Sequence, residues 1–446
     1  MSRYRGNYMH INYRILLITA VAVSISVFSL IYGCTEAENE EEVEKVFKLG
    51  VLGPFSGHTA GIGEEFRGAV EMAFDSVDYQ LGEYRVEIVW IDSQSDAERA
   101  TLAYEKAISE NGIDACILNW HSAVAVAAMD VAARNQVPHF FGLGGSNVVN
   151  EKFAYDPDYY GYYICKGWPV PDKMTNAYLE TLEYAIEKGL WLPRNRKVAI
   201  YGEDSDWGRS FSRAIMEDFE TAGWEIAGEE YFPTGDTELV HLVRRIKDLD
   251  AAVIAGSVAT APSFAAFISE VRKLNMQSLI IGDGFGWIGE WYEITGDNSN
   301  YILDQVPVWS TDEGKQFVKE FEERYGFTPS TSAGGIAYDK TLFFIKIANN
   351  VLQEYGELSS STIYEYAKDN LWSGNITFTG GVIMEEYKFS PESIPDPVVG
   401  EGYFIFPVVQ YNHGQMNIVW PEVWKETDFI TPSYITDKYR DDNQED

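Results

Sequence analysis

The sequence predicts an α/β fold of two doubly wound lobes with mainly parallel sheets. From Phe47 onward, short apolar runs alternate with amphipathic segments of helical spacing, and the alternation occurs in two separate series along the chain. Alternating βα units need crossover helices, and these helices cover both faces of a mainly parallel sheet. With 446 residues, the chain is long enough for roughly two to three domains, each with its own core.

The first series begins with an apolar run at residues 47–52, which is typical of a buried strand. A Gly-Pro turn follows, and then Phe66, Ala69 and Ala73 fall on one face of a helix. The same order of strand, turn and helix then repeats. Further strands are expected at residues 86–91, 115–118 and 137–141, and further helices at residues 100–108 and 122–134.

The second series repeats this order after an aromatic-rich segment, residues 159–169, which we expect to be an extended crossover. A tail after about residue 373 contains strand-like pieces at residues 376–381 and 403–411. The strands of the second series are expected at residues 197–201, 226–232, 252–255 and 279–281, and its helices at residues 210–222, 238–247 and 261–274.

Ligands of such sheets collect beyond the carboxyl ends of the strands. The rule ranks six loops as candidate ligand sites, those after residues 52, 118, 141, 201, 255 and 281.

The charge balance excludes several classes of partner. Asp and Glu number 69 against 34 Lys and Arg, which gives a net charge of -35. So negative a surface repels phosphate backbones and anionic lipid headgroups, so no nucleic-acid partner is expected. A content of 46% hydrophobic and 14% aromatic residues excludes a wholly disordered chain.

The N-terminal segment predicts export. Arg3, Arg5 and Arg14 precede an uncharged run at residues 15–31, which is followed by Cys34. This order resembles a lipoprotein signal peptide, in which residues 1–33 are removed and Cys34 carries the lipid. An uncleaved transmembrane anchor is the alternative. In both cases the remainder is extracytoplasmic and anchored to the membrane.

The cysteine count excludes a disulfide scaffold. Once Cys34 is assigned to the lipid, Cys116 and Cys165 remain. Cys116 lies in an apolar run, so we expect it to be a buried thiol, with a Cys116–Cys165 disulfide as the alternative.

Several short motifs occur together in a fixed order. They are the turn Gly53-Pro54-Phe55-Ser56-Gly57, the triplet Arg67-Gly68-Ala69, a serine that heads an Ala-rich helix, the pair Val137-Pro138 and a Gly-Gly-Ser loop. In order and spacing, residues 47–411 resemble the substrate-binding proteins of branched-chain amino-acid ABC transporters. The resemblance implies a type I periplasmic-binding fold, in which three hinge crossings join two lobes around a ligand cleft.

The chain is expected to divide into a tether, two lobes and a tail, of which the resemblance implies the two lobes. Residues 34–45 are expected to form an acidic tether, and residues 441–446 a disordered tail. The first lobe is expected to comprise residues 46–165 and 306–378, and the second lobe residues 166–305 and 379–440.

On the first lobe, the resemblance assigns ligand contacts to a helix start and to a loop. Ser122 and Ala123 begin the Ala-rich helix, where free N–H groups and the positive end of the helix dipole suit a ligand carboxylate. A simple N-cap is the alternative for Ser122. Gly144, Gly145 and Ser146 match the loop that holds the ligand's amino end, with a flexible turn as the alternative.

On the second lobe, Trp207 matches an aromatic residue that covers the ligand, with core packing as the alternative. Asp283 matches an acidic residue that receives the ligand ammonium, with an Asx turn as the alternative. Ser257 stands where leucine-binding relatives have a second aromatic residue, so a different or larger ligand is expected. Trp120, His121, Trp168 and Trp287 lie near the cleft loops, where they either line a more aromatic pocket or pack in the core.

Catalytic motifs are lacking. His121 and Ser122 are neighbours without a nucleophile elbow, no metal-ligand spacing occurs, and no phosphate-binding loop is present, so no cofactor is expected. The sequence therefore predicts a receptor that captures an amino acid, amide or small carboxylate for an ABC permease. A sensory ectodomain and a cleft hydrolase are the alternatives.

Overall fold

The computed structural model describes residues 45–287, 291–309, 311–400, 403 and 406–436. The chain divides into residues 1–45 and residues 46–446, and the elements below belong to the second unit apart from the first residue of β1. The signal peptide, the Cys34 lipid site, most of the tether and the C-terminal tail lie outside the described residues.

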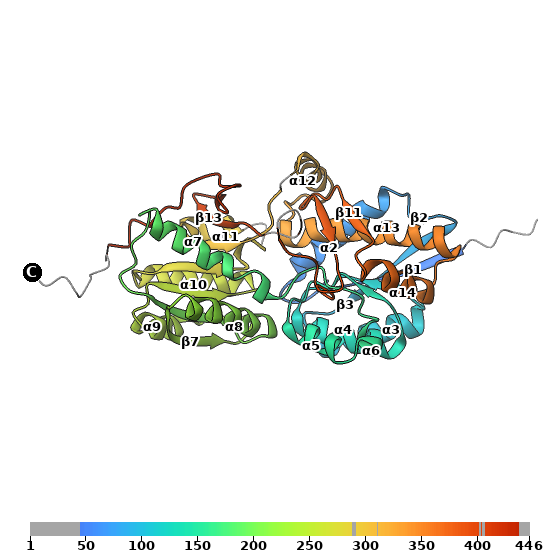
Figure 1. Ribbon diagram of the computed structural model, residues 1–446, viewed down its shortest axis with the longest axis horizontal. Coiled ribbons are helices and arrows are strands. Elements are labelled where there is room, and N and C mark those ends of the chain that lie inside the picture. Colours follow the sequence, from blue (N-terminus) through green and yellow to red (C-terminus); the bar gives the residue numbers. More distant parts are fainter. Residues whose placement is uncertain (1–44, 288–290, 310, 401–402, 404–405, 437–446) are drawn as a thin grey trace, which may run out of the picture. The chain divides into compact units, whose positions relative to one another are not determined.

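The first sheet has five strands in the order β2-β3-β1-β4-β5. β1 pairs in parallel with β4, and β4 with β5, whereas β2 and β3 form an antiparallel pair. Helices α2, α3, α4 and α13 gather around this sheet (Figure 1). The strands span β1 Lys45–Gly53, β2 Gln80–Leu81, β3 Tyr84–Asp92, β4 Ala115–Ile117 and β5 His139–Phe140. The helices span α2 Ala60–Asp75, α3 Ala97–Lys106, α4 Ser122–Asn135, α5 Asn147–Tyr155, α6 Pro157–Tyr160, α12 Asp312–Tyr325, α13 Ile336–Tyr355 and α14 Ser360–Tyr366.

The second sheet has seven strands in the order β14-β13-β10-β9-β8-β6-β7. The pairs from β7 to β10 are parallel, and β13 and β14 add an antiparallel edge. The strands span β6 Lys197–Glu203, β7 Glu225–Phe232, β8 Val253–Ser257, β9 Leu279–Asp283, β10 Leu303–Gln305, β13 Val408–Asn412 and β14 Gln415–Trp420. The helices span α7 Asn176–Glu187, α8 Asp206–Thr221, α9 Val240–Asp248, α10 Ala261–Lys273 and α11 Trp291–Thr295.

The predicted α/β class with mainly parallel sheets is confirmed. One expectation was wrong in part. The aromatic segment 159–169 is not extended throughout. Asp156 caps the short helix α6, and Tyr159 and Tyr160 of the segment are the last two residues of that helix. Beyond α6, isolated bridges join Tyr163 to His139 and Lys166 to Gly142.

The chain passes three times between the two groups of elements. The passages lie between β5 and β6, between β10 and α12, and between the hairpin β11–β12 and β13. The hairpin pairs Thr377–Thr379 with Glu386–Lys388, and Asp339 of α13 accepts hydrogen bonds from the backbone N–H groups of Val382 and Ile383. The boundary predicted between residues 378 and 379 therefore falls inside a hairpin that packs on the first lobe.

A buried ion cluster joins the first and third passages. Lys166 Nζ lies 2.8 Å from Asp396 Oδ1, and both side chains are fully buried. Lys173 Nζ lies 2.9 Å from Asp396 Oδ2. The backbone N–H of Lys166 also donates to the carbonyl oxygen of Pro395, so charge and backbone contacts tie the two passages together.

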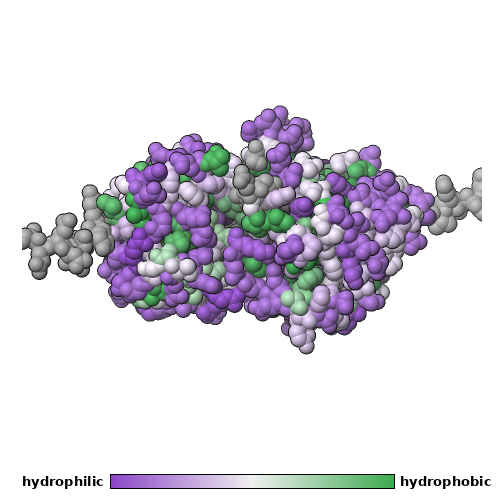
Figure 2. All heavy atoms as spheres, viewed as in Figure 1, coloured by the Kyte–Doolittle hydropathy of each residue, from purple (hydrophilic) through white to green (hydrophobic). Residues whose placement is uncertain are grey.

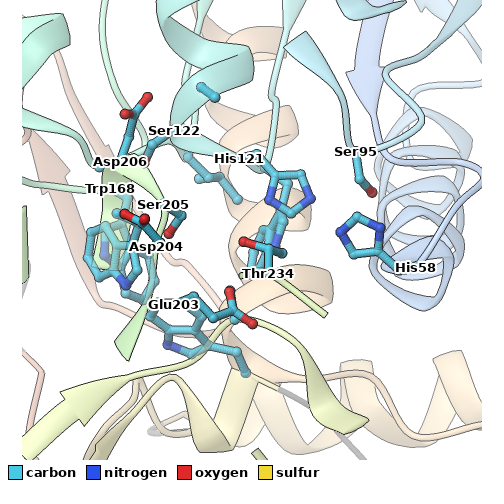
Figure 3. A pocket seen from close by; sticks show the side chains of 17 residues that line it. His58, Ser95, His121, Ser122, Trp168, Glu203, Asp204, Ser205, Asp206 and Thr234 are labelled. Atoms are coloured by element: carbon cyan, nitrogen blue, oxygen red, sulfur yellow. The ribbon is translucent and has the colours of Figure 1, made fainter. Parts of the chain in front are cut away.

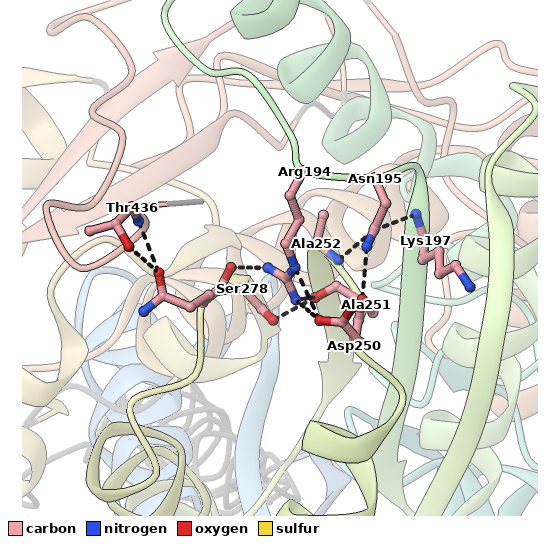
Figure 4. A network of polar contacts seen from close by, with 9 residues as sticks. Arg194, Asn195, Lys197, Asp250, Ala251, Ala252, Ser278 and Thr436 are labelled. Carbon is pink, nitrogen blue, oxygen red and sulfur yellow. Dashed lines mark hydrogen bonds and ion pairs between the residues drawn. The ribbon is translucent and has the colours of Figure 1, made fainter. Parts of the chain in front are cut away.

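The amino ends of the second sheet are tied by a polar network (Figure 4). Arg194 donates to the carbonyl oxygens of Ala251, at 2.7 Å, and Gln277, and it also pairs with Asp250. Asn195 Oδ1 accepts from the backbone N–H groups of Lys197 and Ala252. The network therefore holds the starts of β6, β8 and β9 in register.

Both described cysteines are buried free thiols, so the prediction for Cys116 is confirmed and the alternative disulfide with Cys165 is wrong. Burial raises the pKa of each thiol to about 12. Over the described ranges, no helix has the length and apolar character of a membrane span. The face in Figure 2 is covered mainly by hydrophilic residues.

Candidate functional site: a pocket at the carboxyl ends of both sheets

A pocket of about 400 Å³ lies at the carboxyl ends of the strands of both sheets. Each of the six loops that the sequence ranked contributes lining residues, as does the passage that carries Trp168. The volume falls within the range of small-molecule sites. The residues that the loops contribute include His58, Trp120, Gly145, Glu203, Ala259 and Trp287.

The start of α4 forms one wall of the pocket. Ser122 is the first helical residue, His121 occupies the N-cap position, and no side chain caps the helix. The N-cap alternative for Ser122 is therefore wrong. The first N–H groups of a helix have no intrahelical partner, so those of Ser122 and Ala123, which both line the pocket, suit an acceptor atom of a ligand.

His121 turns away from Ser122. Its Nε2 lies 3.1 Å from Thr59 Oγ1, and its ring centroid lies 5.9 Å from that of His58. Burial, with a smaller effect of His58, lowers the pKa of His121 to about 4, so the ring is neutral at pH 7. His121 and Ser122 therefore do not form the nucleophile and base pair that the hydrolase alternative would need.

The Gly-Gly-Ser loop supplies one lining residue, Gly145. Gly144 donates its backbone N–H to Asn119 Oδ1 at 3.0 Å and does not line the pocket. Ser146 is fully buried, and its Oγ accepts the N–H of Val148 as the N-cap of α5. The ligand contact expected from the Ser146 hydroxyl is not supported, because that oxygen is used by a helix cap.

Trp207 forms the opposite wall and is held from behind. Its Nε1–H donates to Ser257 Oγ at 2.7 Å, and the Ser257 hydroxyl lies 3.2 Å from Asp283 Oδ2. A Cβ atom on Gly145 would lie 2.4 Å from Cζ3 of Trp207, so the indole packs directly on this glycine. Trp207 therefore lines the pocket, and its ring touches a loop of the first sheet, while its contact with a ligand stays a prediction.

Ser257 and Asp283 do not line the pocket. The Asp283 carboxyl is fully buried and accepts the Tyr178 hydroxyl at 3.0 Å. Burial and the neighbouring Asp304 raise its pKa well above the usual range. The predicted contact of Asp283 with a ligand ammonium is not supported, because the carboxyl lies behind Trp207 and Ser257.

Glu203 is a carboxyl group that lines the pocket and that the sequence analysis did not select. The residue is 1% exposed, and the Thr260 hydroxyl donates to Oε1. Burial raises its pKa. Glu203 is the last residue of β6, so the rule of carboxyl ends was the signal that could have identified it.

Four tryptophans line the pocket, and Trp287 is central among them. The Trp287 ring centroid lies 5.9 Å from that of Trp120, 5.7 Å from that of Trp168 and 5.4 Å from that of Trp207. Of the two alternatives that the sequence left open for Trp120, His121, Trp168 and Trp287, the structure places all four residues in the pocket lining, and Trp168 and Trp287 also belong to the buried core. The Trp287 indole N–H has no hydrogen-bond partner among the described residues.

The pocket is acidic. Glu203, Asp204 and Asp206 line it, and within the described part of the chain no Lys or Arg does. Asp204 pairs with Arg209, with 2.8 Å between Oδ1 and Nε. The described residues contain no group of three His, Cys, Asp or Glu side chains that could hold a metal ion.

Two α/β groups with a shared pocket at the carboxyl ends of their sheets define a type I periplasmic binding protein. The family model described as Periplasmic binding protein matches residues 46–366, and the chain belongs to this family. Among curated proteins, it is similar to Leu/Ile/Val-binding protein homolog 8 of Brucella abortus, with 24% identity over 297 residues, which are 63% of this chain and 71% of that protein.

Two solved structures share the fold. A leucine binding protein from Thermotoga maritima has a TM-score of 0.65 and 17% identity, over 84% of this chain and 97% of that chain. A solute binding protein of an ABC transporter from Rhodopseudomonas palustris, in complex with 3,4-dihydroxy benzoic acid, has a TM-score of 0.67 and 16% identity, over 83% and 95%. Family membership and the shared fold together make the chain a binding protein of the periplasmic type.

Proposed function

We propose that the chain is an exported, lipid-anchored receptor that captures a small polar solute, an amino acid or a related amide, and delivers it to an ABC permease. One observation carries the proposal: the pocket takes its walls from both sheets, with Ser122 and Gly145 on one side and Trp207 on the other. A ligand that contacts both walls favours the closed arrangement over the open one, and a permease can recognise that difference.

The start of α4 suits the acceptor end of the solute. A carboxylate or amide oxygen there would receive the N–H groups of Ser122 and Ala123, and the helix dipole favours negative charge at this end. The names of similar proteins support such a ligand, since they include leucine binding and a bound benzoic acid derivative. The neutral His121 adds no positive charge at this wall.

Membrane attachment is a separate part of the proposal. Cys34, outside the described residues, would carry the lipid after removal of residues 1–33. Intact mass spectrometry of the membrane-extracted protein checks it. A chain that begins at a lipidated Cys34 supports the anchor, whereas a chain that retains residues 1–33 contradicts it.

Substitution of Ser122 by proline tests the role of the α4 start. Proline is tolerated at the first helical position, and His121 already has the extended backbone that suits a residue before proline. Ser122→Pro therefore removes the N–H and the hydroxyl without breaking the helix. We expect an affinity loss of about 30-fold for the tightest of a panel of amino acids, amides and carboxylates, measured by calorimetry on the full chain.

Ser122→Ala is the matched control, because it keeps the N–H and removes only the hydroxyl. We expect it to bind with a smaller loss than Ser122→Pro. Small-angle scattering of the unsubstituted chain should show a decrease in the radius of gyration on ligand addition. A panel in which no compound binds or compacts the chain contradicts the proposed function.

A further inference from the structure

Glu203 is a buried carboxyl group that lacks a cationic partner in the described part of the chain. The residue is 1% exposed, and none of the ion pairs of the described residues includes it. The Thr260 hydroxyl fixes Oε1 in place. Taking a carboxylate out of water without a counter-ion costs free energy, so a ligand cation at this position would be stabilised.

Glu203 shares its pocket with four tryptophans and two histidines. In Figure 3 its carboxyl group lies between Trp168 and Ser205 on one side and His58 on the other. Tryptophan is the most frequent residue type in the lining, and Trp287 touches the rings of the other three. Indole faces attract cations, and the attraction is stronger where water is excluded.

We propose that the solute carries an alkylated ammonium group, bound by Glu203 and the pocket tryptophans; this inference rests on the proposed function and names its ligand class. A primary ammonium has three N–H donors that each need an acceptor, whereas the methyl groups of an alkylated nitrogen spread the charge over a surface that packs against indole rings. An aromatic wall with a single buried carboxylate suits the second kind of cation better.

The distribution of charge supports a cation over an anion. Asp206 adds to Glu203 in the lining, which contains no Lys or Arg among the described residues, whereas Asp204 is paired with Arg209. The net charge of -35 also attracts cations over distances up to the Debye length. A simple carboxylate such as benzoate would find only the start of α4 as a positive site, with three acidic residues in the same pocket.

The other end of the solute remains polar. The start of α4 presents the N–H groups of Ser122 and Ala123 to the same pocket, so a carboxylate or hydroxyl group there completes the ligand. Glycine betaine and choline combine these features with a trimethylammonium group. They are therefore the probes, and each has a carbon isostere in which a tert-butyl group replaces the trimethylammonium group and removes only the charge.

The experiment is isothermal titration of the full chain with glycine betaine, choline, their two carbon isosteres, leucine and benzoate. We expect at least one trimethylammonium probe to bind about 30-fold more tightly than its isostere, and more tightly than leucine and benzoate. Equal affinity for probe and isostere, or tighter binding of leucine or benzoate, overturns the inference. If leucine or benzoate binds more tightly and compacts the chain, the inference is overturned but the proposed function stands. If none of the six compounds binds, the inference is overturned.

Glu203→Gln tests the residue itself. It keeps the shape and an acceptor for Thr260 while it removes the charge, so affinity for the tighter probe should fall by about 30-fold and that for its isostere by less than about threefold. Glu238→Gln is the matched control, because Glu238 is an exposed acid of the same lobe and its loss changes net charge equally. Unchanged probe affinity in Glu203→Gln, or an equal loss in Glu238→Gln, overturns the assignment.

Discussion

The amino ends and the carboxyl ends of the strands in the second sheet differ in how their buried polar groups are paired. At the amino ends of the strands, Arg194 and Asn195 satisfy carbonyl oxygens and N–H groups from three strands (Figure 4). At the carboxyl ends, the buried carboxyl of Glu203 has a hydroxyl partner but no cation among the described residues. Paired groups at the amino ends contribute to stability, whereas a buried carboxyl group without a cationic partner at the carboxyl ends is available for a ligand.

The largest effect on stability is expected at the amino ends of the strands. Arg194→Ala removes three contacts and leaves the Gln277 carbonyl oxygen without its donor, so the free energy of unfolding should fall by about 3 kcal/mol. Urea denaturation monitored by circular dichroism measures it, and ligand affinity should stay within about twofold. Arg213→Ala removes an exposed arginine from α8 and should change stability by less than about 0.5 kcal/mol. Equal effects of the two substitutions would show that Arg194 contributes only its charge.

The next effect is at the pocket, where Trp207 packs on Gly145. A leucine at position 145 would occupy the space of the indole ring, since the first added carbon already lies 2.4 Å from Cζ3. We expect Gly145→Leu to weaken binding of the tightest probe by about 100-fold and to shift the tryptophan emission spectrum. Gly61→Leu is the control, because a Cβ there meets no atom within 4 Å. Unaltered affinity in Gly145→Leu would mean that binding does not need this contact.

The smallest effects are expected for two buried serines that lie at opposite ends of the strands. Ser257→Ala removes the acceptor of the Trp207 N–H, so the ring loses its fixed orientation and probe affinity should fall by about fivefold. Ser278→Ala removes a hydrogen bond to the Ala251 carbonyl oxygen and should lower stability by about 1 kcal/mol with affinity unchanged. Calorimetry and urea denaturation of both variants measure the contrast. An affinity loss in Ser278→Ala would contradict the view that the amino ends of the strands contribute to stability and not to ligand binding.

Most of the fold could be predicted from the sequence, because βα alternation is a local pattern. The strand expected at residues 197–201 and the helix expected at residues 261–274 agree with β6 and α10 within two residues. The antiparallel edge of β13 and β14 was not predicted, because strand order depends on pairing between segments that are distant in sequence. The hairpin of β11 and β12 crosses an expected lobe boundary for the same reason.

The site could be predicted only as far as its loops. The rule of carboxyl ends located the pocket, but it does not say which side chain of a loop faces inward. Asp283 and Glu203 both end strands, and only the fold decides that Tyr178 and Ser257 cover the first while the second reaches the cavity. Ser146 has the right chemistry for a ligand, yet its hydroxyl caps α5.

The ion cluster of Lys166, Lys173 and Asp396, in which Lys166 and Asp396 are fully buried, constrains how the lobes can move. Separating such charges inside the protein costs several kcal/mol, so a rotation that keeps the three side chains together is favoured over one that parts them. The axis of lobe rotation should accordingly run close to Asp396. Opening would then be a hinge rotation in which atoms at the pocket rim move farthest and the Asp396 carboxylate moves least.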